Sequence, residues 1–369
     1  MTADGVAEGL YAVRHRFSAR AAGFGYAVGA VLAWFFGLVT PITFTVESIT
    51  VATRTSKERP QILYIVLLSA IPSIILGVTG LYSDFVNLLN VSVIAGIIAG
   101  VGIILTRVGF TYLEQKMATT SVSIIAGVVT YLITNDLVPV IIAAVVTGSL
   151  ADRFLPERFQ KRGEEKDERG GQKGNGTKEG GKQEDDEEKG EKNRFGLMSL
   201  DLKAMIARPV LIGAFSLFAL RTGAVVSYGT VNAELANQPA NLDLVTLMAG
   251  MGSLVSALAG GAPVETTPAP MAAASDPVLS TALFMAIMAG VTLSGLVGRL
   301  GRYIPLEAIA GFLVVLGIFV IIPQQLPNLV EDPLPGATAL AVTALSNPFY
   351  GIIAGELVLL VTMIGLGMV

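Results

Sequence analysis

The sequence has no cysteine, one histidine and one tryptophan, and it carries little charge outside a single segment. Without cysteine, a small secreted domain held by disulfides is excluded, and a lone His15 supports neither a metal site nor a histidine relay. Of the 29 acidic and 25 basic residues, 12 and 11 lie between Glu157 and Arg194. The remaining charge is too sparse to cover a soluble protein, which excludes a soluble enzyme and a nucleic-acid-binding protein.

Long apolar runs are what the sequence does contain. Hydrophobic residues make up 52% of the 369 residues, and the mean hydropathy is +0.66. Several runs approach the roughly 20 residues that a helix needs to cross a bilayer. The sequence therefore predicts an all-α polytopic protein of the cell (inner or plasma) membrane. The expected unbroken passes are 22–37, 61–81, 86–106, 119–134, 137–151, 208–228, 243–259, 278–298, 304–323, 335–346 and 348–369.

Two further apolar stretches, 38–53 and 260–275, are interrupted by prolines such as Pro41 and Pro263. Because proline blocks a helix interior, each stretch is predicted to be an extended segment that leads into a half-helix. This gives about thirteen passes, two of them broken.

The broken stretches expose an internal repeat. Residues 40–43 align with 262–265, so that Thr43 matches Glu265, and 93–96 align with 308–311. The leading helix of the second half, 208–228, has no counterpart in the first half. Duplicated halves with a break at matching positions are typical of a secondary transporter whose binding site lies at the breaks.

Charge divides the chain into four parts. Residues 1–20 are predicted to be a cytoplasmic N-terminal segment, either a short helix on the membrane surface or a disordered end. Residues 21–155 and 201–369 form the two membrane repeats, and 156–200 form a disordered, charged cytoplasmic linker. Thirteen passes put every lysine and arginine except Arg221 on one side, which the positive-inside rule makes the cytoplasmic side.

Ionisable residues inside the passes are the candidates for a site. Arg221 lies in the middle of 208–228, where it would bind a charged substrate or form a structural ion pair. Glu47 and Glu265 lie near the breaks, where each would bind substrate, carry a coupling proton or merely cap a helix start. Glu356, in the last pass, is either functional or structural.

Hydroxyl side chains crowd the same breaks. Thr43, Thr266 and Thr267 would bind substrate or Na⁺, or would satisfy the backbone groups that the breaks leave free. The sequence contains no Gly-Lys-Ser/Thr phosphate loop, so the chain by itself is not an ATP-driven pump. We expect no cofactor and no metal site.

The motif Gly-Ala-Pro-Val-x-Thr at 261–266, followed by Met-Ala-Ala at 271–273, resembles the broken tenth helix of the xanthine/uracil permease (nucleobase–ascorbate transporter) family. Residues 40–48 and 303–317 resemble further blocks of that family, closest to the adenine/guanine/hypoxanthine permease branch. The resemblance implies a core domain and a gate domain built from two inverted seven-helix repeats. It also implies coupling to H⁺ or Na⁺, a homodimer, and a nucleobase bound between the two broken helices and the eighth helix.

Arg221 departs from that family, which has an acidic residue at the matching place. A buried arginine favours an anionic substrate, and sulfate-permease-type and benzoate-type carriers resemble the same layout. A channel or a sensor would need a pore or a ligand module, and the linker supplies no such module.

We therefore expect a secondary active transporter of nucleobases that works by alternating access and is not an enzyme. The alternative is an anion transporter of the same fold, for sulfate, benzoate or another carboxylate, that uses Arg221. Its expected partners are the small substrate, the coupling H⁺ or Na⁺ and the lipid bilayer, with no nucleic acid. The predicted substrate-binding residues are Thr43, Glu47, Arg221, Glu265, Thr266 and Thr267, with Glu47 and Glu265 also predicted to bind the coupling ion.

Overall fold

The computed structural model describes residues 2–56, 58–154, 201–267, 269–301 and 305–365. The predicted charged linker, residues 156–200, lies wholly outside these residues. The first half contains α1 (Thr2–Arg14), α2 (Ala19–Phe36), β1 (Ile42–Phe44), α3 (Val46–Thr55), α4 (Arg59–Thr79), α5 (Tyr82–Asn87), α6 (Val91–Gln115), α7 (Met117–Thr134) and α8 (Leu137–Phe154). The second half contains α10 (Leu202–Met205), α11 (Arg208–Leu235), α12 (Leu242–Leu258), β2 (Val264–Thr266), η2 (Pro270–Ala273), α13 (Pro277–Leu293), α14 (Leu296–Gly301), η3 (Leu306–Ile309), α15 (Ala310–Val315), η4 (Leu316–Ile321), α16 (Ile322–Leu329), α17 (Pro333–Leu345) and α18 (Pro348–Gly365).

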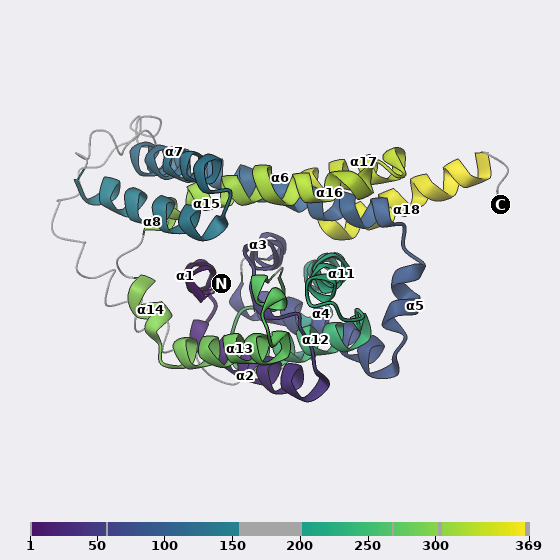
Figure 1. The fold of residues 1–369 in the computed structure, drawn as a ribbon. Helices are drawn as coiled ribbons and strands as arrows, with labels where there is room; N and C mark the ends of the chain where they lie inside the picture. Colours follow the sequence, from purple (N-terminus) through teal and green to yellow (C-terminus); the bar gives the residue numbers. More distant parts are fainter. Residues whose placement is uncertain (1, 57, 155–200, 268, 302–304, 366–369) are drawn as a thin grey trace.

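The helices form two layers (Figure 1). One, the gate layer, consists of α6–α8 and the segments η3 to α18. The other, the core layer, consists of α1–α4, α11–α13, β1, β2 and η2. Helices α1, α3 and α11 lie on the side of the core layer that faces the gate layer. Helices α5 and α14 lie at the two ends, between the layers.

The helices match the predicted membrane passes. Six of them in the described part of the chain are long and apolar enough to cross a bilayer: Ala19–Phe36, Arg59–Thr79, Val91–Gln115, Met117–Thr134, Arg208–Leu235 and Glu307–Leu329. Large apolar side chains such as Trp34, Phe35 and Leu132 are more than half exposed on them. Such contiguous exposed apolar surface is what lipid covers. The all-α membrane architecture is therefore confirmed.

The two halves pack as an inverted repeat. Helix α12 of the second half packs against α4 of the first, and α2 of the first packs against α13 of the second. Within each half, the last two helices also pack together, α7 with α8 and α17 with α18. Strands β1 and β2 pair in antiparallel orientation, with Thr43 opposite Glu265. These are the two residues that the sequence repeat aligns, so the pseudo-two-fold axis passes through this pair.

The first helix corrects one sequence prediction. Residues 2–14 form neither a surface helix nor a disordered end, because α1 packs against α3, α13 and α14 and buries Leu10 and Tyr11. A Cβ at Gly9 would overlap the side chain of Phe44, so glycine allows this close approach. Helix α1 touches β1 and α3 much as α11 touches β2 and η2. The first repeat thus has a short leading helix in addition to the thirteen expected passes.

The broken segments also differ from one another. The first becomes the expected half-helix, α3, directly after β1. The second continues only into η2, a 3₁₀ turn of four residues, rather than into a half-helix. The prolines around this turn explain the difference, since Pro270 removes a backbone donor and fixes the backbone angle φ.

Charge separates the two ends of the helices. The ends near Arg14, Arg54, Lys116, Arg153, Arg208 and Arg299 form what we call the basic face, and the opposite ends, near Asp84, Asp136, Glu234, Asp243, Asp276 and Asp332, form the acidic face. Contacts between distant segments support both groups. Arg59 Nε donates to the carbonyl of Arg16 at 3.1 Å on the basic face, and Asn90 Nδ2 donates to Asp332 at 2.7 Å on the acidic face. The assignment of the basic face to the cytoplasm stays a prediction.

Candidate functional site

A cavity of about 410 Å³ lies between the two layers. Its core-layer lining comes from α1, both broken segments and α11, and its gate-layer lining comes from α6–α8 and α15–α16. The volume falls within the range of small-molecule sites. The lining residues are Glu8, Thr43, Thr45, Glu47, Ser48, Ile98, Val101, Tyr131, Asn135, Asp136, Leu137, Leu220, Ala224, Tyr228, Glu265, Thr266, Thr267, Phe312, Leu316, Val320, Ile321 and Gln324.

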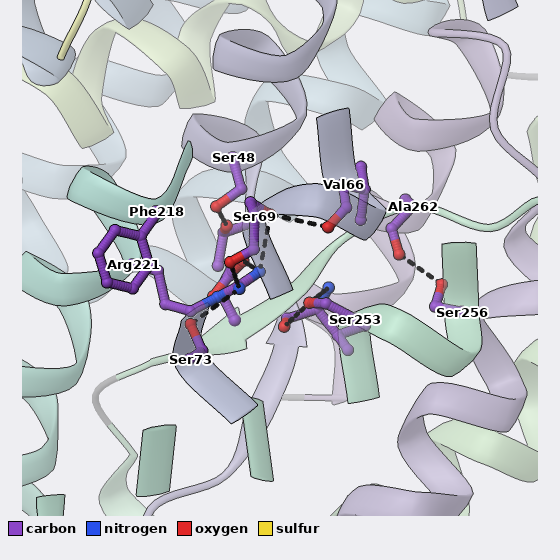
Figure 2. Close-up of polar contacts among 12 residues, drawn as sticks. Ser48, Val66, Ser69, Ser73, Phe218, Arg221, Ser253, Ser256 and Ala262 are labelled. Atoms are coloured by element: carbon purple, nitrogen blue, oxygen red, sulfur yellow. Dashed lines mark hydrogen bonds and ion pairs between the residues drawn. The ribbon is translucent and has the colours of Figure 1, made fainter. Parts of the chain in front are cut away.

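Hydroxyl and amide side chains anchor the strand of the second broken segment. Ser253 on α12 donates to the carbonyl of Val264 at 2.7 Å and accepts its N–H at 3.1 Å. Ser256 donates to the carbonyl of Ala262, a bond that Figure 2 shows. These bonds replace the helical ones that the break removes, which is the structural role that the sequence leaves open for such hydroxyls.

Asn232 on α11 fixes the end of the same segment. The side chain is fully buried. Its Nδ2 donates to the carbonyl of Thr267 at 2.8 Å, and its Oδ1 accepts the N–H of Ala269 at 2.8 Å. The sequence analysis missed this residue. A signal was present, since a buried polar side chain in an apolar helix needs partners of its own.

The first broken segment is anchored through α2. Tyr26 Oη accepts the N–H of Phe44 at 2.8 Å and lies 2.9 Å from Thr43 Oγ1. The rings of Tyr26 and Phe44 are buried and meet edge to face. Thr43 thus lines the cavity while its hydroxyl is already bonded to the protein.

Arg221 forms a buried ion pair with Glu265. Its Nε and Nη2 donate to the two carboxylate oxygens at 2.7 and 2.5 Å, and both side chains are almost completely buried. The third nitrogen, Nη1, donates to the carbonyl of Ser69 at 2.8 Å and to Ser73 Oγ at 3.2 Å, both on α4. Figure 2 shows the guanidinium directed toward Ser69 and Ser73. A bidentate pair of this kind is geometrically specific as well as strong.

The ion pair is one of the two roles that the sequence left open for Arg221. Leu220, Ala224 and Tyr228 recur every four residues on the face of α11 that lines the cavity, whereas Arg221 is turned toward α4 and is not among the lining residues. Arg221 therefore does not line the cavity, because all three of its guanidinium nitrogens bond Glu265, Ser69 or Ser73. Glu265 belongs to the lining, but both of its oxygens accept from Arg221.

Glu47 is a predicted site residue that lines the cavity. It lies in the first turn of α3 and is half-buried in the cavity wall, beside Thr45 and Ser48. Its carboxylate accepts the N–H of its own residue, so the capping role that the sequence leaves open is partly real. Glu47 is thus a carboxylate of the cavity lining.

A second carboxylate, Glu8 on α1, lines the cavity as well. Tyr228 lies within electrostatic reach of both Glu8 and Glu47. The sequence analysis missed Glu8 because it assigned no membrane helix to residues 1–20. The spacing of Gly5 and Gly9, typical of closely packed membrane helices, is the signal that could have revealed it.

The remaining candidates divide between the cavity and the scaffold. Thr266 and Thr267 line the cavity, and the buried Thr266 Oγ1 has no partner among the described residues. Glu356 lies elsewhere, where it accepts the N–H of Asn90 at 3.1 Å at the start of α6. Its role is therefore the structural one that the sequence left open.

The comparisons with known proteins concern the fold. No protein-family model and no curated protein matches the sequence. Among solved structures, the transmembrane domain of the cyanobacterium bicarbonate transporter BicA is similar, with a TM-score of 0.59 and 18% identity. The match covers 95% of this chain and 97% of that one. The chain has the fold of a membrane transporter. This fold is consistent with the permease family that the motifs resemble, but no match selects a branch of it.

Proposed function

We propose that the protein is a secondary transporter of small, uncharged, hydrogen-bonding solutes, and that nucleobases are its substrate class. One observation carries the choice of substrate. Every charged side chain that lines the described cavity is acidic, because the guanidinium of Arg221 is held behind the cavity by Glu265, Ser69 and Ser73. An anion would meet carboxylates of its own sign, whereas a neutral ring with N–H donors would meet acceptors.

The lining contains the two kinds of group that bind a nucleobase, hydrogen-bonding side chains and aromatic rings. Glu47 accepts ring N–H donors, and the hydroxyls of Thr266 and Thr267 complement ring carbonyls. Tyr228 from α11 and Phe312 from the gate layer supply aromatic surface for a flat ring. Thr43 also lines the cavity, but its hydroxyl is already bonded to Tyr26, so in this proposal it shapes the wall rather than binding the ring.

The coupling site in this proposal is Glu47, with Glu8 as a second carboxylate in the same cavity lining, and the coupling ion is H⁺. A carboxylate that alternates between the cavity and solvent can bind and release a proton in each cycle. Glu265 is a poorer candidate than the sequence suggests, because a protonated Glu265 would leave Arg221 buried without its counter-charge. Arg221 and Glu265 therefore hold β2 in position for the residues beside it.

Alternating access follows from the two layers. The substrate lies between the core and gate layers, so movement of one layer against the other would expose it to each side of the membrane in turn. The fold match to a transporter domain supports this mode of action.

An anion is the second candidate substrate, and two observations favour it. The structure matched above belongs to a bicarbonate transporter. The N-terminus of α3 also adjoins the cavity at Glu47 and Ser48, and a helix N-terminus attracts negative charge. Such a substrate would have to enter with protons that neutralise the carboxylates.

Binding to purified protein in liposomes tests the proposal. Radiolabelled xanthine, uracil and adenine are compared with benzoate, sulfate and bicarbonate, at pH 6 and pH 8. We expect a nucleobase to bind, and Glu47→Gln to weaken that binding by about 10- to 100-fold, the value of one hydrogen bond to a charged group. Glu356→Gln is the matched control, because this carboxylate lies in a membrane helix away from the cavity. Binding of an anion with no nucleobase would overturn the proposed substrate class.

A further inference from the structure

Three hydroxyls join the layers on one side of the cavity. Tyr11 Oη on α1 lies 2.9 Å from Thr50 Oγ1 on α3, and both side chains are buried. Tyr112 on α6, in the gate layer, is buried and lies within reach of the same Tyr11 hydroxyl. We call Tyr11, Thr50 and Tyr112 the seam. Around it, α1 packs against α8 and η3, and α3 packs against α6, so the layers touch broadly here.

The seam lies between the cavity and the basic face. Glu8 and Glu47 line the cavity, and each lies three residues before a seam residue, Tyr11 and Thr50, on the same helix. Three residues are about one helical turn, or roughly 5 Å. Beyond the seam, α1 ends at Arg14, α3 has Arg54 in its last turn, and α6 ends just before Lys116. The seam therefore closes the cavity one turn below its two carboxylates.

The opposite end of the cavity is open. Asn135, Asp136 and Gln324 line the cavity and are exposed. Asn135 and Asp136 form the turn between α7 and α8, which lies on the acidic face. The conformation is thus closed toward the basic face and open toward the acidic face.

Charge at the seam opposes its closure. Arg54 of the core layer lies within electrostatic reach of Arg107 of the gate layer. Like charges across an interface favour separation, so the hydroxyl bonds and the surrounding packing hold the layers together against this repulsion. A contact balanced in this way is suited to open and close during each transport cycle.

We propose that Tyr11, Thr50 and Tyr112 form the gate that seals the cavity from the basic face. The contact of Tyr11 with Tyr112, together with the packing of α1 on α8 and of α3 on α6, closes it across the layers, and Thr50 orients the Tyr11 hydroxyl. By the positive-inside rule the basic face is cytoplasmic, which makes this the outward-open state with its inner gate shut. The proposal rests on alternating access, the mode of action proposed above, but not on the identity of the substrate.

The absence of native cysteine allows a direct test, since a single introduced cysteine is the only thiol. Ala224→Cys on α11 places a reporter in the cavity wall. A membrane-impermeant maleimide is applied to vesicles of either orientation. We expect labelling of the reporter from the acidic face, and slow labelling from the basic face. Adding Tyr112→Phe removes the hydroxyl that faces Tyr11 across the layers and should raise labelling from the basic face about two- to tenfold.

Two further variants make the test specific. Thr50→Val should raise labelling from the basic face in the same direction, because it frees the Tyr11 hydroxyl from its orienting partner. Tyr64→Phe is the matched control, since Tyr64 Oη accepts the N–H of Asp201 on the basic side of the core layer and has no place in the seam. It should leave labelling unchanged. Equal labelling from both faces without seam changes, or no response to Tyr112→Phe and Thr50→Val, would overturn the gate. Because labelling needs no substrate, these outcomes are independent of the binding assay.

Discussion

Replacing Arg221 with alanine should destabilise the protein strongly, and the contacts of its guanidinium set the magnitude. The change leaves Glu265 as a buried carboxylate without a counter-charge and removes donors from the Ser69 carbonyl and Ser73 Oγ. Breaking a buried ion pair from one side costs about 3–5 kcal/mol. We expect Arg221→Ala to lose about this much unfolding free energy, with a matching fall in the apparent melting temperature in detergent.

A double-mutant cycle separates the pair from its surroundings. Glu265→Leu alone strands the guanidinium and should cost a similar amount. The double variant Arg221→Leu/Glu265→Leu removes both charges, so it should be much more stable than the sum of the single changes predicts. The melting temperature of each purified variant, measured at one detergent and lipid concentration, gives the coupling energy. Arg221→Lys should recover only part of the loss, because an ammonium cannot match both carboxylate oxygens.

The opposite pattern would refute this account of Arg221. If Arg221→Ala melted like the parent protein but no longer transported, the guanidinium would be acting on the substrate rather than on Glu265. Additive effects of the Arg221 and Glu265 substitutions would likewise mean that the two side chains do not depend on one another.

Three further predictions concern the scaffold around the site. Asn232→Ala should cost about 2–6 kcal/mol of unfolding free energy, because two backbone groups of the second broken segment lose their buried partner. Gly311→Ala should cost about 1–3 kcal/mol of unfolding free energy, since the added methyl group would overlap the backbone of α7. Gly290→Ala should be tolerated, because the added methyl group meets no neighbour. The melting temperatures of the two variants test this difference. Burial lowers the pKa of His15, which lies in the turn between α1 and α2. The unfolded state therefore takes up the proton first, so stability should fall as the pH drops below about 6.5, and His15→Gln should flatten that dependence. If the melting temperature fell by the same amount from pH 7.5 to pH 5 in the parent protein and in His15→Gln, His15 would not be the cause of the pH dependence.

The repeat was the most informative feature of the sequence. The repeat aligns Thr43 with Glu265, and in the structure β1 and β2 pair at this position. Hydropathy located the unbroken passes because a span of lipid imposes its own length on a helix. It failed at α1, whose glycines and Glu8 lower the local hydropathy although neighbouring helices bury the segment.

The partners of charged residues could not be predicted from the sequence. Arg221 and Glu265 are 44 positions apart, and only the packing of α11 beside β2 shows that they neutralise each other. The same limit applies to the seam, whose three hydroxyls come from α1, α3 and α6. Sequence patterns indicate which residues are costly in a membrane, whereas the fold decides which of them remain available to a substrate.

The interleaving of the two repeats has a consequence for biosynthesis. Helix α4 ends at Thr79, but α12, on which it packs, begins only at Leu242. The separation in sequence between α2 and its packing partner α13 is longer still. At about 5–20 residues per second, ribosomes would take roughly 10–30 s to supply the missing helix. Until α11 is made, the Ser69 carbonyl and Ser73 Oγ of α4 also lack the Arg221 guanidinium that donates to them in the folded protein. Newly made chains are therefore most exposed to membrane quality control and chaperones before the second repeat arrives.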